Sequence, residues 1–372
     1  DLVRIAESGI REVWIDTARG TDVAAPAAAA VEVAVEVAEA APAAAPVGAP
    51  AAVVAPPEAP VALAEELTRA RRIVDAGKRQ VVSMFQEARL GAAVSVEAAG
   101  GLVDEIASSV LRNPGALVSL ARLKTVDDYT YMHSVAVCAL MVSLARTLGL
   151  DAAATREAGM AGLMHDLGKA RIPVEVLNKP GRLTDAEFGV VRRHPEHGHA
   201  LLVEGGGAGP GVLDVCLHHH EKVDGSGYPH RLKGADISLL AKMGAVCDVY
   251  DAITSNRPYK AGWCPAESVR RMTAWCDGHF DKAVFHAFVK SIGIYPVGSL
   301  VRLASDRLAV VTEQAGTSLL TPVVKVIYAI GSGVHLAPAV LDLAGAAGED
   351  RIVSIESAEK WGITGLEKHW AV

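Results

Sequence analysis

The segment Gly162-Leu-Met-His-Asp-Leu-Gly-Lys169 places a histidine directly beside an aspartate within a helical pattern. Imidazole and carboxylate groups together suit first-row divalent metals, and such an aspartate can bridge two metals while its neighbour binds one. A single histidine in a helix is usually a packing or surface residue. Nine of the thirteen histidines, however, fall between His133 and His230, and this density favours a metal-binding cluster.

Helical periodicity extends from this segment in both directions and predicts a mainly α fold. Glycine and proline residues mark the ends of the expected helices. These helices are expected at residues 61–90, 97–112, 133–149, 152–168, 185–204, 211–220, 238–255 and 265–291. Three short β-branched runs follow and predict a small antiparallel sheet, with strands at residues 299–303, 308–313 and 322–329.

Composition divides the chain into five segments. The first has the apolar pattern of the last helix and strand of an α/β module that begins upstream. The second is rich in alanine, proline and valine without a basic residue, which is typical of a semi-extended linker; a short alanine-rich helix is the alternative. A lead-in helix, a helical domain with the histidines and a β-rich subdomain complete the chain. We expect these five segments at residues 1–22, 23–60, 61–95, 96–292 and 293–372.

The 372-residue chain has a net charge of −7, which argues against a dedicated binder of nucleic-acid polymers. Its five cysteines are odd in number and form no CxxC pair, so we expect reduced thiols in a cytoplasmic protein. Because no apolar run reaches about 18–20 residues, we expect no membrane span. We also find no signal peptide.

The charges near the histidines indicate an anionic substrate. Two divalent ions, Asp166, Asp248 and one bridging hydroxide would leave a net positive centre, because neutral imidazoles add no charge. Lys169, Arg257 and Lys260 would make the centre more positive, which suits a ligand with two phosphodiester groups. A solvated surface position is the alternative for each of these three cations.

Four stretches of the helical domain resemble the motifs of the HD-GYP family. They are the segment quoted above, Ile172-Pro173 with Leu177-Asn-Lys-Pro-Gly181, His219-His-Glu-Lys-Val-Asp-Gly-Ser-Gly-Tyr-Pro229, and Cys247-Asp-Val-Tyr-Asp-Ala-Ile-Thr-Ser-Asn-Arg-Pro-Tyr-Lys260. The resemblance covers residues 96–292. It implies an HD-superfamily helical bundle and a metal-dependent phosphodiesterase that hydrolyses cyclic di-GMP to pGpG, and to GMP where a second bond is cut. A weaker resemblance of the first 22 residues is to a domain of unknown function that often precedes HD-GYP domains.

The resemblance further implies a dinuclear metal centre with a bridging hydroxide, and iron or manganese as the metals. The implied ligands are His133, His165, Asp166 and Asp248 for one metal, and His194, His219, His220 and the shared Asp166 for the other. Asp166 and Lys169 would be catalytic, with the lysine at the scissile phosphate. Members with three metals carry a glutamate four residues before the first histidine ligand; here Tyr129 occupies that place, so two metals are expected.

The family's substrate-binding positions can also be assigned. Arg257 and Lys260 match the basic pair that holds the phosphates of the ligand. Gly227, Tyr228 and Pro229 match the loop that names the family, which would contact the ligand or dock GGDEF-type diguanylate cyclases and other signalling proteins. A homodimer is a further open expectation.

Other functions compete with this interpretation. A catalytically weak cyclic di-GMP receptor or scaffold is one alternative, although no implied ligand is missing. An enzyme for another cyclic dinucleotide, such as cyclic GMP-AMP, is a second, because Arg257 and Lys260 cannot read a base; these residues favour a dinucleotide over a nucleotide monophosphate. A purely structural helical bundle is disfavoured because adjacent metal-type residues bring no packing benefit.

Several polar residues of the same region are expected to have lesser roles. We expect no metal-binding role for the remaining histidines, which include His197, His199, His218 and His230. Glu221 is expected to orient a ligand histidine. Asp224 and Asp251 are expected to form structural hydrogen bonds.

Overall fold

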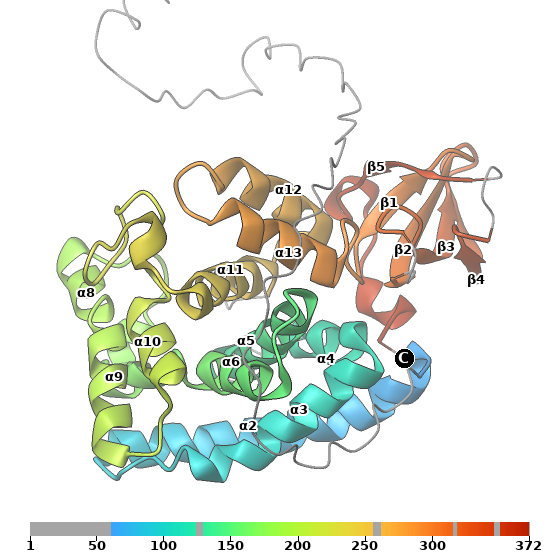
Figure 1. Ribbon diagram of the computed structural model, residues 1–372. Coiled ribbons are helices and arrows are strands. Elements are labelled where there is room, and N and C mark those ends of the chain that lie inside the picture. Colours follow the sequence, from blue (N-terminus) through green and yellow to red (C-terminus); the bar gives the residue numbers. More distant parts are fainter. Residues whose placement is uncertain (1–60, 124–128, 256–261, 315–317, 346–349, 372) are drawn as a thin grey trace, which may run out of the picture. The chain divides into compact units, whose positions relative to one another are not determined.

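The computed structural model describes residues 61–123, 129–255, 262–314, 318–345 and 350–371 (Figure 1). The described residues all belong to one compact unit. Within the described ranges it is mainly helical and ends in a five-stranded antiparallel sheet, as the sequence predicts. The expected N-terminal module and linker lie outside the described residues.

The helices and strands have the following bounds. The α-helices are α2 (Leu63–Arg89), α3 (Gly100–Arg112), α4 (Pro114–Ala121), α5 (Tyr129–Thr147), α6 (Ala152–Met164), α7 (Val174–Leu177), α8 (Asp185–Val191), α9 (His194–Gly205), α10 (Pro210–His218), α11 (Leu239–Thr254), α12 (Pro265–Trp275) and α13 (Lys282–Ile292). A 3₁₀ helix, η2 (Leu167–Arg171), follows α6. The strands are β1 (Leu300–Leu303), β2 (Arg307–Glu313), β3 (Val323–Ala329), β4 (Val334–Asp342) and β5 (Ile352–Ile355).

The lead-in helix α2 is amphipathic, and it packs against α3, α4 and α5. Leu67 and Ala70 of its apolar face are buried in the same core as α5 and α6. A buried carboxylate on this helix, Glu66, accepts hydrogen bonds from Ser109 Oγ at 2.7 Å and Arg112 Nε at 2.6 Å, both on α3. The lead-in helix therefore belongs to the core of the domain.

Helix α5 runs through the middle of the helical domain, beside α6 (Figure 1). It also contacts α2, α3, α4, α11 and α13. Residues 132–145 of this helix are all buried, because a helix that is apolar on every side must be covered on every side. His133 is thereby placed inside the protein.

Two of the predicted helices are each divided in the structure. The helix expected at 185–204 breaks before His194, because Pro195 lacks a backbone N–H and therefore starts a new helix, α9. The helix expected at 265–291 breaks into α12 and α13, and Asp281 caps the second of these. Helices α4 and α7 were not predicted.

The C-terminal sheet has the strand order β4-β3-β2-β1-β5. The three predicted strands correspond to β1, β2 and β3 within one residue, whereas the two edge strands were not predicted. Alternating residues of β1 and β2 serve two cores: Leu300 and Val310 join the helical core, while Val301 and Val311 form a second small cluster. β4 contains Pro338, which an edge strand tolerates because its outer side forms no ladder.

Two further sequence expectations concern the cysteines and the membrane. All five cysteines are free, and all except Cys264 are buried. In the part of the chain that the structure describes, no helix combines the length and the apolar character needed to cross a membrane.

Candidate metal centre

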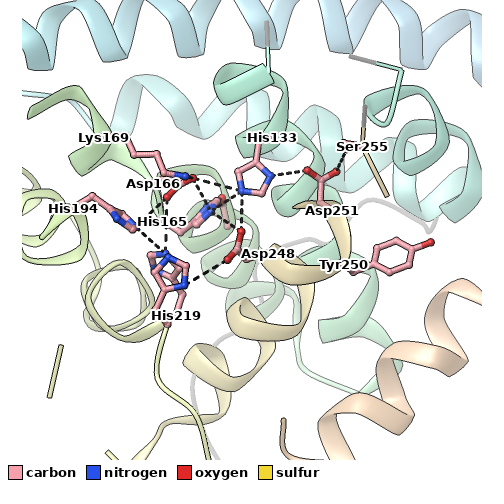
Figure 2. A network of polar contacts seen from close by, with 12 residues as sticks. His133, His165, Asp166, Lys169, His194, His219, Asp248, Tyr250, Asp251 and Ser255 are labelled. Carbon is pink, nitrogen blue, oxygen red and sulfur yellow. Dashed lines mark hydrogen bonds and ion pairs between the residues drawn. The ribbon is translucent and has the colours of Figure 1, made fainter. Parts of the chain in front are cut away.

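Five segments of the helical domain bring histidine and aspartate side chains to one place (Figure 2). The contributors are α5 with His133, the turn after α6 with His165 and Asp166, the start of α9 with His194, the turn after α10 with His219 and His220, and α11 with Asp248. Two groups form, His133–His165–Asp166 and His194–His219–His220, and within each the potential ligand atoms lie within 4.8 Å of one another. The structure thus brings together all seven residues of the expected ligand set.

The turn that carries His165 and Asp166 depends on close packing. Helix α6 ends just before His165 instead of continuing to residue 168, and η2 takes over two residues later. Gly168 in η2 lies against the start of α9, where a Cβ would come within 1.8 Å of the carbonyl oxygen of His194. Glycine is therefore required here, and its small size lets Asp166 approach His194.

Hydrogen bonds fix the orientation of four histidine rings. Nδ1 faces a backbone carbonyl in three of them: Gly162 O at 2.7 Å from His165, Val191 O at 2.8 Å from His194 and Val215 O at 3.0 Å from His219. Nδ1 of His133 faces the carboxylate of Asp251 at 2.5 Å. Because these oxygens only accept hydrogen bonds, each Nδ1 carries a hydrogen, and in the neutral rings of His165, His194 and His219 the Nε2 atom therefore keeps its lone pair.

The four Nε2 atoms face one another in pairs. His133 Nε2 lies 3.3 Å from His165 Nε2, and His194 Nε2 lies 3.3 Å from His219 Nε2. Two lone pairs at this distance repel each other unless a cation lies between them or beside them. A proton is a poor candidate in the second group, because burial holds the pKa of His219 well below its usual value. The donor set therefore fits a divalent metal.

Asp166 lies between the two groups and faces both. Its Oδ2 is 3.5 Å from His133 Nε2 and 3.4 Å from His165 Nε2, whereas its Oδ1 is 3.2 Å from His194 Nε2 and 3.9 Å from His219 Nε2. Oδ1 is buried and has no hydrogen-bond partner among the described residues. An ionised oxygen in this situation needs a cation, and one carboxylate oxygen per group is the arrangement of a bridging ligand.

Asp248 also spans the two groups. Its Oδ1 lies 2.9 Å from His133 Nε2, and its Oδ2 lies 3.7 Å from His220 Nδ1 (Figure 2). The family resemblance implies a role for Asp248 in the first group alone. In the structure its second oxygen is turned toward the second group.

Both aspartates are ionised at neutral pH. Burial would raise the pKa of Asp166, but the charge of Lys169 and the neighbouring His165 outweigh burial and hold the pKa well below its usual value. Burial acts in the same direction on Asp248, where His133 outweighs it and again keeps the pKa low. Two ionised carboxylates beside the single ammonium group of Lys169 make this a place where a further cation would be stabilised.

The histidines differ in their own pKa values. Burial lowers the pKa of His220 to about 3, so this ring is neutral at physiological pH. Burial also opposes protonation of His133, but the carboxylates of Asp248 and Asp251 outweigh it and raise the pKa of that ring. His133 thus differs from His219 and His220, whose pKa values are lowered by burial.

Lys169 has a direct contact with the centre. Its Nζ donates a hydrogen bond to Asp166 Oδ2, and 23% of its side chain is exposed. The ammonium group therefore lies at the rim of the centre, between the buried carboxylate and solvent. Its catalytic role stays a prediction.

The Gly227-Tyr228-Pro229 loop covers His220. The Tyr228 ring centroid lies 4.7 Å from that of His220, with 33° between the ring planes. A Cβ on Gly227 would come within 2.5 Å of the backbone nitrogen of Lys222, so glycine is needed for the loop to fold back. The expected substrate-binding loop is therefore adjacent to the expected ligands.

Glu221 has a different role from the one expected. Its carboxylate accepts hydrogen bonds from the backbone N–H groups of His230 at 2.7 Å and Leu232 at 3.1 Å. It anchors the chain just after the Gly227-Tyr228-Pro229 loop and does not orient a ligand histidine. Asp224, as expected, forms a local hydrogen bond, with the backbone N–H of Ser226.

Three expected positions cannot be placed. Arg257 and Lys260 lie outside the described residues, and so does the side chain of Tyr129.

Asp251 was expected to form a structural hydrogen bond, and its partner is a member of the centre, His133. A signal for this role was present, because Asp251 follows Asp248 by three residues and therefore shares its helix face.

Comparisons with known proteins agree with this geometry. Residues 106–284 match a family described as HD domain, and residues 1–99 match a domain of unknown function, DUF3391. A protein of Pseudomonas aeruginosa named cyclic di-GMP phosphodiesterase PA4108 is 55% identical over 373 residues, which cover 100% of this chain and 86% of that protein.

More distant relatives share the helical domain. The cyclic di-GMP phosphodiesterase response regulator RpfG of Xanthomonas campestris is 47% identical over 32% of each chain. The 3′3′-cGAMP-specific phosphodiesterase 1 of Vibrio cholerae is 36% identical over 44% of this chain and 38% of its own. A solved HDG"Y"P protein of Bdellovibrio bacteriovorus, Bd1817, has a TM-score of 0.50 and 20% identity over 60% of this chain and 72% of its own, which supports the fold. The motifs, the fold and the near full-length relative together establish that this chain belongs to the HD-GYP family of HD-domain proteins.

Proposed function

We propose that this protein is a metal-dependent phosphodiesterase that hydrolyses cyclic di-GMP to pGpG, and to GMP where the second bond is also cut. The observation that carries the proposal is the position of Asp166, with one carboxylate oxygen toward each group of histidines. A pair of sites that share one carboxylate is the arrangement for a two-metal phosphoryl-transfer centre. The names of the relatives support the choice of substrate.

Seven side chains would hold two divalent ions, for which we propose iron or manganese. The first ion would be held by His133, His165, Asp166 and Asp248, and the second by His194, His219, His220 and Asp166. When bound, the ions would supply Lewis-acid activation of a phosphoryl oxygen and of water. A mixed set of imidazole and carboxylate ligands suits these metals better than magnesium, which prefers oxygen alone.

The protein's own groups would prepare the site for the phosphodiester. The Nδ1 hydrogen bonds hold the histidine rings in place before any ligand arrives, so little reorganisation is needed. Lys169 would donate to an anionic oxygen of the scissile phosphate from its position at the rim. Tyr228 would form one wall beside His220. Arg257 and Lys260 would hold the phosphates.

The remaining proposals concern the rest of the chain and its partners. The Gly227-Tyr228-Pro229 loop would also dock diguanylate cyclases of the GGDEF type or other signalling proteins. Residues 1–22 would belong to an N-terminal regulatory module, joined to the helical domain by the linker at 23–60. A cytoplasmic location and a homodimer stay predictions of the same kind.

The first test is loss of the centre by mutation. We expect the double variant His165→Ala/Asp166→Ala to lose bound metal and hydrolysis, while circular dichroism shows the helical content largely unchanged. The measurement is metal analysis after anaerobic purification, followed by chromatography of the products from cyclic di-GMP. His199→Ala is the control, because this histidine lies on α9 outside the two groups, and it should keep both properties.

Two outcomes would contradict the proposal. Full hydrolysis by the double variant would exclude the centre as the catalytic site. Wild-type protein that binds cyclic di-GMP without metal and without turnover would instead support the receptor alternative. Parallel assays with cyclic GMP-AMP would show whether the enzyme prefers that dinucleotide.

A further inference from the structure

Arg192 completes a stack of side chains that begins at the metal centre. It lies at the C-terminal end of α8, two residues before His194. Its guanidinium carbon lies 4.5 Å from the centroid of the Tyr228 ring, and that ring lies against His220. Arg192, Tyr228 and His220 therefore form a continuous series of contacts that reaches a proposed metal ligand.

The guanidinium group of Arg192 has no acidic partner among the described residues. Arg112 and Arg156, in contrast, each hold a carboxylate, on Glu66 and Asp104. Stacking on an aromatic ring covers one face of a guanidinium and fixes its plane, but it leaves the N–H groups at the edge free to donate. Arg192 is thus a half-buried cation that contacts the rings of Tyr228 and Phe188, and it lies beside the proposed substrate site.

The proposed function lacks a residue that reads the base. Lys169, Arg257 and Lys260 are assigned to phosphates, which every cyclic dinucleotide carries. Guanine presents two acceptors, O6 and N7, on one edge, and these match the two parallel N–H donors of an arginine. Adenine presents a donor, N6, in place of O6, so the same arginine cannot bind it in this way.

The position of Arg192 fits a base better than a phosphate. The scissile phosphate would lie at the metals, and Arg192 contacts the Tyr228 ring, which itself lies against the ligand His220. A fixed guanidinium plane is useful for a planar edge, whereas a phosphate can be held as well by a mobile ammonium group.

We propose that Arg192 binds the O6 and N7 edge of one guanine of the substrate and thereby gives the enzyme its preference for guanine. This inference rests on the proposed function and adds its base specificity. Arg193 offers a matched control, because it is adjacent in sequence but 67% exposed and its nearest acidic group is Glu196, at 3.9 Å.

The experiment compares Arg192→Gln, Arg192→Lys and Arg193→Gln with the wild type, using cyclic di-GMP and cyclic di-AMP as substrates. We expect wild type to prefer cyclic di-GMP. Both Arg192 variants should raise KM for cyclic di-GMP on the order of 10- to 100-fold, with little change in kcat or in KM for cyclic di-AMP. Arg193→Gln should behave as wild type. Metal content and melting temperature show that the variants are folded.

The Arg192→Lys variant distinguishes binding of a base by Arg192 from binding of a phosphate. If Arg192→Lys keeps the wild-type KM while Arg192→Gln loses it on both substrates, the residue binds a phosphate and the inference is wrong. Unchanged guanine preference in both Arg192 variants, or a wild type that treats the two dinucleotides alike, would also overturn it while leaving the proposed function intact. A metal-loaded wild type that hydrolyses neither would overturn the proposed function and this inference with it.

Discussion

Asp251 shows how one carboxylate can distinguish one histidine ligand from the others. The backbone carbonyls that face His165, His194 and His219 are neutral, whereas Asp251 is a carboxylate and lies 2.5 Å from His133 Nδ1. A carboxylate at Nδ1 makes the imidazole a better electron donor at Nε2. His133 should therefore bind its metal more tightly than it would with a neutral carbonyl group at Nδ1.

We expect Asp251→Asn to weaken metal binding at the His133 group about 10- to 100-fold, with the helical fold intact. The measurement is residual metal after dialysis against chelators of graded affinity. Asp214→Asn is the matched control, because Asp214 contacts the Nδ1 of His218 at 2.7 Å in the same way, but His218 belongs to neither group. Equal metal retention by wild type and Asp251→Asn would show that the carboxylate only fills space.

At the scale of elements, the sequence predicted the positions of most helices and strands better than the points at which a helix breaks. The helical pattern around His133 and the three β-branched runs were correct because local periodicity reports which face of an element is buried. Pro195 divides one predicted helix and thereby places His194 at a helix start. The edge strand β4 escaped prediction because an exposed strand with a proline lacks the alternating pattern.

The candidate site, too, could be predicted only in part from the sequence. Adjacent pairs such as His165-Asp166 and His219-His220 show in the sequence which residues are candidate metal ligands, but they do not show how these residues are arranged in space. The distribution of the two oxygens of Asp166 between two groups is a property of packing among α5, η2, α9 and α10, and no single segment encodes it. Arg192 was missed for this reason, since its neighbour Tyr228 is 36 positions away in the sequence.

The close packing between η2 and α9 should not tolerate the one methyl group that alanine would add at Gly168. In Gly168→Ala the new Cβ would meet the backbone oxygen of His194, which cannot move without its helix, so α9 must shift. We expect a loss of about 1–3 kcal/mol in the free energy of unfolding, or more, together with loss of metal from the His194 group. Urea denaturation and metal analysis test both effects.

The control for that variant is Gly189→Ala on α8, where an added Cβ meets nothing within 4 Å. Alanine is the better helix former, by up to about 1 kcal/mol, so this variant should be as stable as wild type or slightly more stable. If Gly168→Ala retained full stability and metal, the close approach of η2 and α9 would not be what positions Asp166.

At the scale of the whole molecule, the lead-in helix α2 packs onto the helical domain that holds the centre. The buried Glu66 of α2 is the polar part of this contact. Burial would raise the pKa of Glu66, but hydrogen bonds from Arg112 and Ser109 outweigh burial and lower it. A carboxyl group whose pKa is lower in the folded state stabilises the fold above its unfolded pKa, and this contribution is lost as pH falls through the folded value.

We therefore expect Glu66→Gln to lower the free energy of unfolding at pH 7 by about 3–5 kcal/mol, because the mostly buried Arg112 would lose its ion pair with the Glu66 carboxylate. The deficit relative to wild type should shrink as pH falls below the usual pKa of a glutamate, about 4.3, and on through the lower folded pKa of Glu66, since wild type then loses the same ion pair. Glu65→Gln is the control: Glu65 is 55% exposed and pairs with Arg69 at the surface, so its loss should change little at any pH. Denaturant unfolding of the three proteins from pH 7 to pH 3 measures this, and a deficit that stayed constant with pH would mean that Glu66 acts through shape and not through charge.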